Sequence, residues 1–249
     1  MLSWKKILDQ LESGELRAAY QNEHNEWIVN TQVKEAILQA FKAGKNCALR
    51  GLYKGFIDKD TLQPRCFTLK DKVRIVPTGS CVRHGAYVAP KVIIMPPSYI
   101  NVGAYIDSNS MIDSHVLVGS CAQIGKNVHL SAGVQIGGVL EPIGAKPVII
   151  EDEVFVGAGA IIVEGILVRK RAVIAPGVIL SRGIPIYDCV NKCVITDHVI
   201  PENAVIVSGT RPINSAWAKQ QNLFVACALL IKQRDNKSDA ALTLEQILR

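Results

Sequence analysis

Long apolar runs are missing from this 249-residue chain, although 49% of its residues are hydrophobic. No stretch approaches the roughly 20 consecutive apolar residues that cross a bilayer. The N-terminal segment 1–14 is amphipathic and carries acidic residues, which a secretory signal peptide does not. These absences predict a cytoplasmic protein without a membrane anchor.

Aromatic residues and dense basic tracts are also scarce. Only 6% of the residues are aromatic, so a core must be built from aliphatic and small side chains. The net charge of +6 is modest and no basic tract is interleaved with aromatics, which argues against a nucleic-acid partner. A mildly basic protein instead suits small anionic ligands.

Paired cysteine motifs are absent as well. The seven cysteines are odd in number and none forms a CxxC pair. This pattern favours reduced thiols over a disulfide framework or a zinc cage. Cys189 and Cys193 have no matching second pair, and we therefore predict no metal site.

What the sequence does contain is a repeat of six residues. Aliphatic residues recur at every sixth position from Val82 to Ile136, and a second, mostly small or aliphatic set follows each of them four places later, from Ala86 to Leu140. The repeat is interrupted at 141–149, resumes from Ile150 to Leu180, is interrupted again at 185–199, and ends with Ile200 and Ile206.

A period of six fits neither an α-helix nor a long strand. It predicts a mainly β protein in which short strands turn a corner after each hexad, so that three hexads close one triangular coil of a parallel β-helix. The first position of each hexad points inward and the fifth packs beside it. Each inward aliphatic side chain contributes roughly 1.5–3 kcal/mol of burial.

The segments that flank the repeat predict other elements. Residues 3–14 read as a helix capped by Ser3 and ending near Gly14, and residues 31–44 as a second helix capped by Thr31 and closed by Gly44. Residues 222–235 read as a buried strand and 242–249 as a short terminal helix. We expect an N-terminal helical or mixed domain over 1–81, the β-helix over 82–210, and a C-terminal cap over 211–249.

Three stretches carry a family resemblance: MPPSYINVGAYID (95–107), VGSCAQIGKNVHLSAGVQIGGVLEP (118–142) and PVIIEDEVFVGA (147–158). With the hexads they resemble the hexapeptide-repeat acyltransferases, and most closely the bacterial tetrahydrodipicolinate N-succinyltransferases. The resemblance implies a left-handed coil and a homotrimer with its sites at subunit interfaces. It also implies transfer of succinyl from succinyl-CoA to tetrahydrodipicolinate, in lysine and diaminopimelate biosynthesis.

The resemblance also assigns substrate-site residues. Arg74 in KVRIVP matches an arginine that binds substrate in the family, and a planar guanidinium suits a carboxylate. Asp113 in SMIDSH matches the family's substrate-contacting, catalytic aspartate. From the residues alone, Arg74 could equally be a solvated arginine and Asp113 a turn-capping acid.

The chain departs from the family at two places near this site. The family segment G-A-R-S-E-V-V-E-G reads GAGAIIVEG here, so that Gly159 replaces an arginine and Ile161, at an outward position, replaces the glutamate that acts beside the aspartate. Glu164 is retained in both patterns and is a poor substitute. An aromatic residue two places after the aspartate is replaced by His115.

Two histidines have alternative readings. His115 could act as a general base, as a histidine does in other hexapeptide acyltransferases, or could be a surface or interface residue. His129, in the matching motif, is expected to orient its neighbours by hydrogen bonding.

For coenzyme A, backbone donors are expected from glycine-rich turns, and basic groups are expected near the phosphates. The candidates for binding the coenzyme are Gly137, Gly138, Gly157, Ala158 and Lys232. The basic run 169–171 either contacts the coenzyme or is a solvated charged edge.

Two alternatives to the succinyltransferase remain open at this stage. One is a divergent paralogue that acylates a different amino-acid-like amine, for example in an antimetabolite pathway. The other is a β-helix whose catalysis has decayed. The substitutions at Gly159 and Ile161 motivate both.

Overall fold

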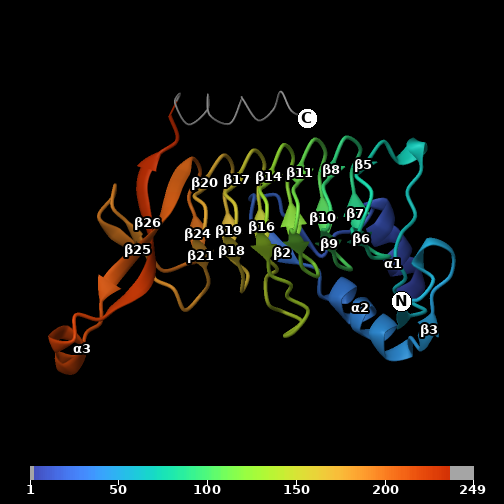
Figure 1. Cartoon of the computed structure of the whole chain (residues 1–249), viewed down its shortest axis with the longest axis horizontal. Helices are drawn as coiled ribbons and strands as arrows, with labels where there is room; N and C mark the ends of the chain where they lie inside the picture. Colours follow the sequence, from blue (N-terminus) through green and yellow to red (C-terminus); the bar gives the residue numbers. More distant parts are fainter. Residues whose placement is uncertain (1–2, 236–249) are drawn as a thin grey trace.

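The computed structural model describes residues 3–235 and contains the coil that the hexads predict (Figure 1). Strands of two residues alternate with tight turns, and each strand pairs in parallel with the strand one coil away. The predicted left-handed parallel β-helix is therefore confirmed, and its three sheets form the three faces of a prism.

The three faces are named in the order in which the chain visits them from Tyr87. Face 1 contains β7 (Tyr87–Val88), β10 (Tyr105–Ile106), β13 (Gln123–Ile124), β16 (Ile149–Ile150), β19 (Leu167–Val168) and β24 (Val199–Ile200). Face 2 contains β5 (Arg74–Ile75), β8 (Ile93–Ile94), β11 (Met111–Ile112), β14 (His129–Leu130), β17 (Phe155–Val156), β20 (Val173–Ile174) and the start of β25 (Ala204–Pro212). Face 3 contains β6 (Cys81–Val82), β9 (Tyr99–Ile100), β12 (Leu117–Val118), β15 (Gln135–Ile136), β18 (Ile161–Ile162) and β21 (Ile179–Leu180).

The core of the coil consists of the inward residue of each hexad. Every predicted first position from Val82 to Leu180 is buried, and so is the second set from Ala86 to Val134. Leu140 was predicted to belong to this set, and that prediction is wrong. It is half-buried against the N-terminal apolar cluster, because the chain leaves the coil after Ile136 and returns at Ile149.

Two helices precede the coil and lie beside its first turns (Figure 1). Helix α1 (Trp4–Ser13) is capped by Ser3, and Gly14 ends it at φ 81°, as predicted. A side chain at Gly14 would be strained at that φ, and its Cβ would lie 2.8 Å from the Tyr87 ring. Helix α2 (Thr31–Ala43) is capped by Asn30 and not by Thr31, because the Asn30 side chain accepts the hydrogen bond from the Val33 N–H.

The N-terminal segment covers face 1. Hairpin β1–β2 (Ala19–Gln21 and Trp27–Val29) packs Ala19 and Trp27 on Ile149 and Leu167. A second hairpin, β3–β4 (Asn46–Ala48 and Ile57–Lys59), and two short 3₁₀ helices (Gly51–Tyr53 and Leu69–Asp71) lead to the first coil.

Beyond the coil, β25 and β26 (Phe224–Gln233) form an antiparallel arm that projects past the last turn, with α3 (Ala216–Gln220) at its tip (Figure 1). The second interruption forms β22 (Ile186–Asp188) and β23 (Cys193–Ile195), which join the same sheet. The strand predicted over 222–235 is present, but most of it is exposed and only its middle is buried. The predicted helix over 242–249 lies outside the described residues.

Candidate functional site

Face 2 places Arg74 and Asp113 on the same side of the coil. Arg74 in β5 pairs with Ile93 in β8, which pairs with Met111 in β11, and Asp113 directly follows β11. Two strand spacings of about 4.8 Å separate their strands, so the long Arg74 side chain and the Asp113 carboxylate can reach one small ligand.

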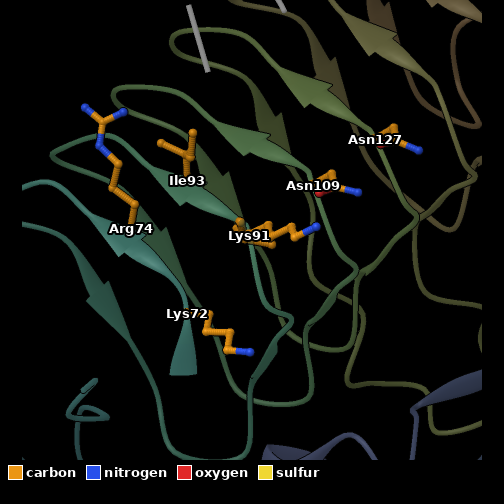
Figure 2. Close-up of a pocket in the computed structure, with 7 residues that line it drawn as sticks. Lys72, Arg74, Lys91, Ile93, Asn109 and Asn127 are labelled. Atoms are coloured by element: carbon orange, nitrogen blue, oxygen red, sulfur yellow. The ribbon is translucent and has the colours of Figure 1, made fainter. Parts of the chain in front are cut away.

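Arg74 borders a cavity of about 530 Å³ that is lined by cations and amides (Figure 2). Lys72, Lys91, Asn109 and Asn127 extend from successive turns toward one side of it, while the Arg74 guanidinium extends from the strand in another direction. Among residues 3–235, no acidic side chain lines this cavity, so its potential favours an anion.

Lys72 and Lys91 were not found from the sequence. Each occupies a left-handed turn position, at φ 53° and 66°, and Asn109 and Asn127 follow in the same conformation at φ 61° and 55°. From Lys91 onward these turn residues are spaced by 18, which is one full coil. That spacing in the sequence was the signal that could have found them.

Asp113 is held by its own turn. Its Oδ1 accepts a hydrogen bond of 2.7 Å from the Ser114 N–H, and its backbone carbonyl accepts one of 2.8 Å from the buried Ser98 hydroxyl. Oδ2 has no partner among residues 3–235 and is available to a ligand. The turn-capping role and the substrate role are therefore compatible, because they use different oxygens.

His115 lies two residues further on in the same turn. It is exposed, adopts φ 63°, and donates its backbone N–H to the Pro97 carbonyl at 2.7 Å. Its side chain borders a small hollow of about 240 Å³ that Tyr99 and Leu117 also line. Burial raises the pKa of the Tyr99 phenol, so this phenol stays protonated at neutral pH. The exposed His115 imidazole is therefore the candidate general base among the residues that line this hollow.

His129 lies in the outer column of face 2, between Met111 and Phe155. Its ring meets the Phe155 ring edge-on, with centroids 5.2 Å apart. This contact places His129 in side-chain packing.

Ile161 lies in the outer column of face 3, paired with Gln135 on one side and Ile179 on the other. The position faces out of the coil and is half-buried. Glu164, three residues later, accepts a 2.7 Å hydrogen bond from the Arg182 N–H, so it fixes the next coil.

The backbone N–H groups of the glycine-rich turns form hydrogen bonds within the coil. The N–H groups of Gly137, Gly157 and Gly159 donate to Ile162, Ile174 and Ala132 in neighbouring coils. A side chain at Gly138 would lie 2.6 Å from the Ser120 nitrogen. The N–H groups of Gly137 and Gly157 are thus used within the coil, and the prediction that these two residues contact the coenzyme would have to involve their other backbone atoms.

The basic residues considered for binding the coenzyme phosphates form ion pairs within the chain. Arg169 lies 3.3 Å from Glu151, and Lys170 and Arg171 lie 3.7 and 3.1 Å from Glu153. Lys232 is exposed on β26 and pairs with Asp235 at 2.7 Å. These contacts favour the charged-edge reading of 169–171.

Two further findings concern metals and membranes. Residues 3–235 contain no group of three or more histidine, cysteine, aspartate or glutamate side chains placed to hold a metal ion. In the same range, no helix is long and apolar enough to cross a bilayer.

Comparison with known proteins adds family information. Residues 147–182 match the hexapeptide repeat of succinyl-transferase, and residues 4–43 match the N-terminal region of tetrahydrodipicolinate N-succinyltransferase. Three curated relatives are each named 2,3,4,5-tetrahydropyridine-2,6-dicarboxylate N-succinyltransferase. They come from Nitrosomonas europaea (42% identical), Herminiimonas arsenicoxydans (44%) and Nitrosospira multiformis (44%), and each match covers 98% of this chain and 88% of the relative.

Proposed function

The chain belongs to the tetrahydrodipicolinate N-succinyltransferase family, and on that premise we propose how its own residues carry the reaction. It is an acyltransferase that transfers succinyl to tetrahydrodipicolinate in lysine and diaminopimelate biosynthesis, with succinyl-CoA as the donor. The observation that carries this assignment is the identity of 42–44% over 98% of the chain. Neither the divergent paralogue nor the decayed β-helix is favoured by it.

Arg74 holds a carboxylate of the acceptor. The guanidinium is exposed on face 2 and borders the cationic cavity, where no acidic residue of the described part of the chain competes for it. Its planar pair of donors matches a carboxylate in two parallel hydrogen bonds. This contact fixes the ring of the acceptor relative to Asp113.

The ring nitrogen of tetrahydrodipicolinate belongs to a C=N bond and carries no proton, so water first adds across this bond and leaves an N–H on the nitrogen. The chemical step then joins this nitrogen to the thioester carbonyl. The C–N bond forms, the C–S bond breaks, and the sulfur of coenzyme A leaves with the electron pair. Asp113 Oδ2 accepts a hydrogen bond from the N–H and orients it. The nitrogen loses its proton to His115, which passes it to the departing sulfur.

His115 thereby replaces the missing carboxylate at Ile161. The two substitutions compensate, because one removes a base from the outer column of face 3 and the other supplies a base in the turn after Asp113. Histidine is the side chain most often used to accept a proton and to return it during catalysis.

The assembly is a homotrimer whose faces 2 and 3 meet between subunits, and the acyl-CoA lies in the groove they form. The outer column of face 3 supports this arrangement, because Leu117 and Ile161 are half-buried, Ile179 is exposed, and an apolar patch at the surface marks an interaction site. The proposed coenzyme contacts are Gly137, Gly138, Gly157, Ala158 and Lys232, with Gly137 and Gly157 using backbone atoms other than their N–H groups. The division into domains at 81 and 210 is likewise a proposal.

Release of free coenzyme A thiol tests this function. Succinyl-CoA and tetrahydrodipicolinate are mixed with the protein, and mass spectrometry identifies the succinylated product. We expect turnover that depends on both substrates. Thiol release without a succinylated acceptor, or no release at all, would contradict the proposal.

A further inference from the structure

A second cavity, of about 390 Å³, lies on the other side of the corner between faces 1 and 2. We call it the seam pocket, because both the N-terminal segment and the coil line it. Arg17, Gln21, Asn25 and Trp27 come from the N-terminal segment. The coil contributes residues at the ends of its face 1 strands, among them Asp107, Lys126 and Asp152.

Arg17 is the central cation of the seam pocket. Its guanidinium lies 3.7 Å from the centroid of the Tyr105 ring and 5.4 Å from that of Trp27. Its Nε donates to Gln123 Oε1 at 2.9 Å. Within residues 3–235 the two terminal nitrogens of Arg17 have no hydrogen-bond partner, so a positioned fork of donors faces the cavity.

Two half-buried carboxylates flank this guanidinium without pairing to it. Asp107 uses Oδ1 to accept from the Ser108 N–H at 2.7 Å, and Asp152 uses Oδ1 to accept from the Lys126 N–H at 2.8 Å. Burial lowers the pKa of Arg17, and the nearby charges of Tyr105, Asp107 and Asp152 act in the opposite direction. Within the described residues, the second oxygen of each carboxylate accepts no hydrogen bond and is available to another donor.

The remaining walls of the seam pocket are fixed by other contacts. Trp27 Nε1 donates to Glu151 Oε1 at 2.9 Å, and Arg169 lies 3.3 Å from the same carboxylate. A side chain at Gly125 would lie 2.4 Å from Asp152 Oδ1, so the glycine lets this carboxylate approach the coil. The pocket is therefore a built cavity in which the Arg17 guanidinium lies beside one carboxylate oxygen each of Asp107 and Asp152 that accepts no hydrogen bond within residues 3–235.

We propose that the seam pocket binds a free α-amino acid, whose carboxylate is held by Arg17 and whose ammonium lies between Asp107 and Asp152. A simple anion would be repelled by the two carboxylates, and a simple cation would be repelled by Arg17. A zwitterion satisfies both groups at once. The polar side chains of Gln21 and Asn25 complete a wall suited to a polar amino-acid side chain.

Such a ligand would couple the N-terminal segment to the coil. Arg17 and Asp107 belong to these two parts of the chain, and an amino acid that bridges them stabilises their contact by mass action. The site is separate from Arg74 and Asp113, which lie on and beyond the strands of face 2.

Calorimetric titration of the full chain tests the proposal with four probes. Glycine and L-lysine carry both charges, succinate carries only carboxylates, and 1,5-diaminopentane carries only ammonium groups. We expect at least one of the two amino acids to bind at least about tenfold more tightly than either single-sign probe. Absence of amino-acid binding would overturn the proposal, and so would binding of succinate with equal affinity that Arg17→Gln abolishes and Arg74→Ala does not.

Variants locate the binding site. Arg17→Gln and Asp107→Asn should each weaken amino-acid binding at least about tenfold. The second variant keeps the test decisive if the first weakens the packing of the N-terminal segment. Arg74→Ala is the matched control, and it should leave amino-acid binding unchanged. Binding that survives Asp107→Asn, or that is lost in Arg74→Ala, would contradict the assignment to the seam pocket.

Discussion

The outward position of the hexad has different surroundings on face 1 and face 3. On face 1, Ile149 and Leu167 are buried under the hairpin β1–β2. On face 3, Leu117 and Ile161 are half-buried, Ile179 is 43% exposed, and no apolar cluster of residues 3–235 includes them. One repeat thus builds a face that the chain covers itself and a face that it leaves for a partner.

Assembly should respond most strongly to a change on the uncovered face. We expect Leu117→Asp to convert the proposed trimer into monomers, a fall of about threefold in solution mass, because a charge would be buried between subunits. Activity should be lost with it. Light scattering measures the mass. Tyr20→Asp, on the exposed side of β1, is the control and should keep the native mass.

The second-largest effect should be the loss of catalytic rate when Asp113 is replaced. Asp113→Ala should lower kcat by about 10²–10⁴, because the carboxylate acts on the substrate, and should lower the thermal midpoint no more than Asn101→Ala does. Asn101→Ala is a matched control, since the Asn101 side chain also accepts a hydrogen bond from the next N–H, at 2.9 Å. A comparable loss in both variants would mean that Asp113 only fixes its turn.

A substitution on the covered face, face 1, should lower the stability of the fold. Ile149→Ala should lower the free energy of unfolding by about 2–5 kcal/mol, because it opens a cavity under the N-terminal hairpin. Ile179→Ala, at the same hexad position on face 3, should cost less than about 1 kcal/mol. Denaturant unfolding at one fixed protein concentration measures both. Equal losses would remove the distinction between the two faces.

Arg74 should give the smallest of these effects, confined to substrate binding. Arg74→Ala should raise KM for the dicarboxylate about tenfold to a hundredfold, because a charged hydrogen-bonded pair is lost. Arg74→Lys should recover part of this loss. An unchanged KM in steady-state kinetics would show that the guanidinium does not hold the acceptor.

The coil was predictable from the sequence because the backbone turns a corner every six residues and so requires an inward apolar side chain at the same interval. Every inward aliphatic side chain repeats at the same interval, so Ile106 and Leu130 could be assigned to the core without a structure. The cap at Asn30 was missed because Asn30 and Thr31 are both good capping residues and only the backbone decides between them. Leu140 was misassigned because the chain leaves the coil one hexad earlier than the pattern suggests.

The site was predictable only in part. The hexads place Asp113 and Ile161 on outward positions, but their roles come from the family. The cluster around Arg17 depends on contacts across 106 residues, such as the bond to Gln123, and no local pattern encodes these. Lys34 is fully buried and donates to the Ala145 carbonyl, which helical periodicity alone does not predict for a lysine.

The central claim is that this chain transfers succinyl although Ile161 replaces a carboxylate. Its most direct test is the kcat of the native protein beside that of Ile161→Glu, with succinyl-CoA and tetrahydrodipicolinate at saturation. The native protein should turn over, and its rate should fall at least about a hundredfold in His115→Gln. An inactive native protein that becomes active only as Ile161→Glu would contradict the account.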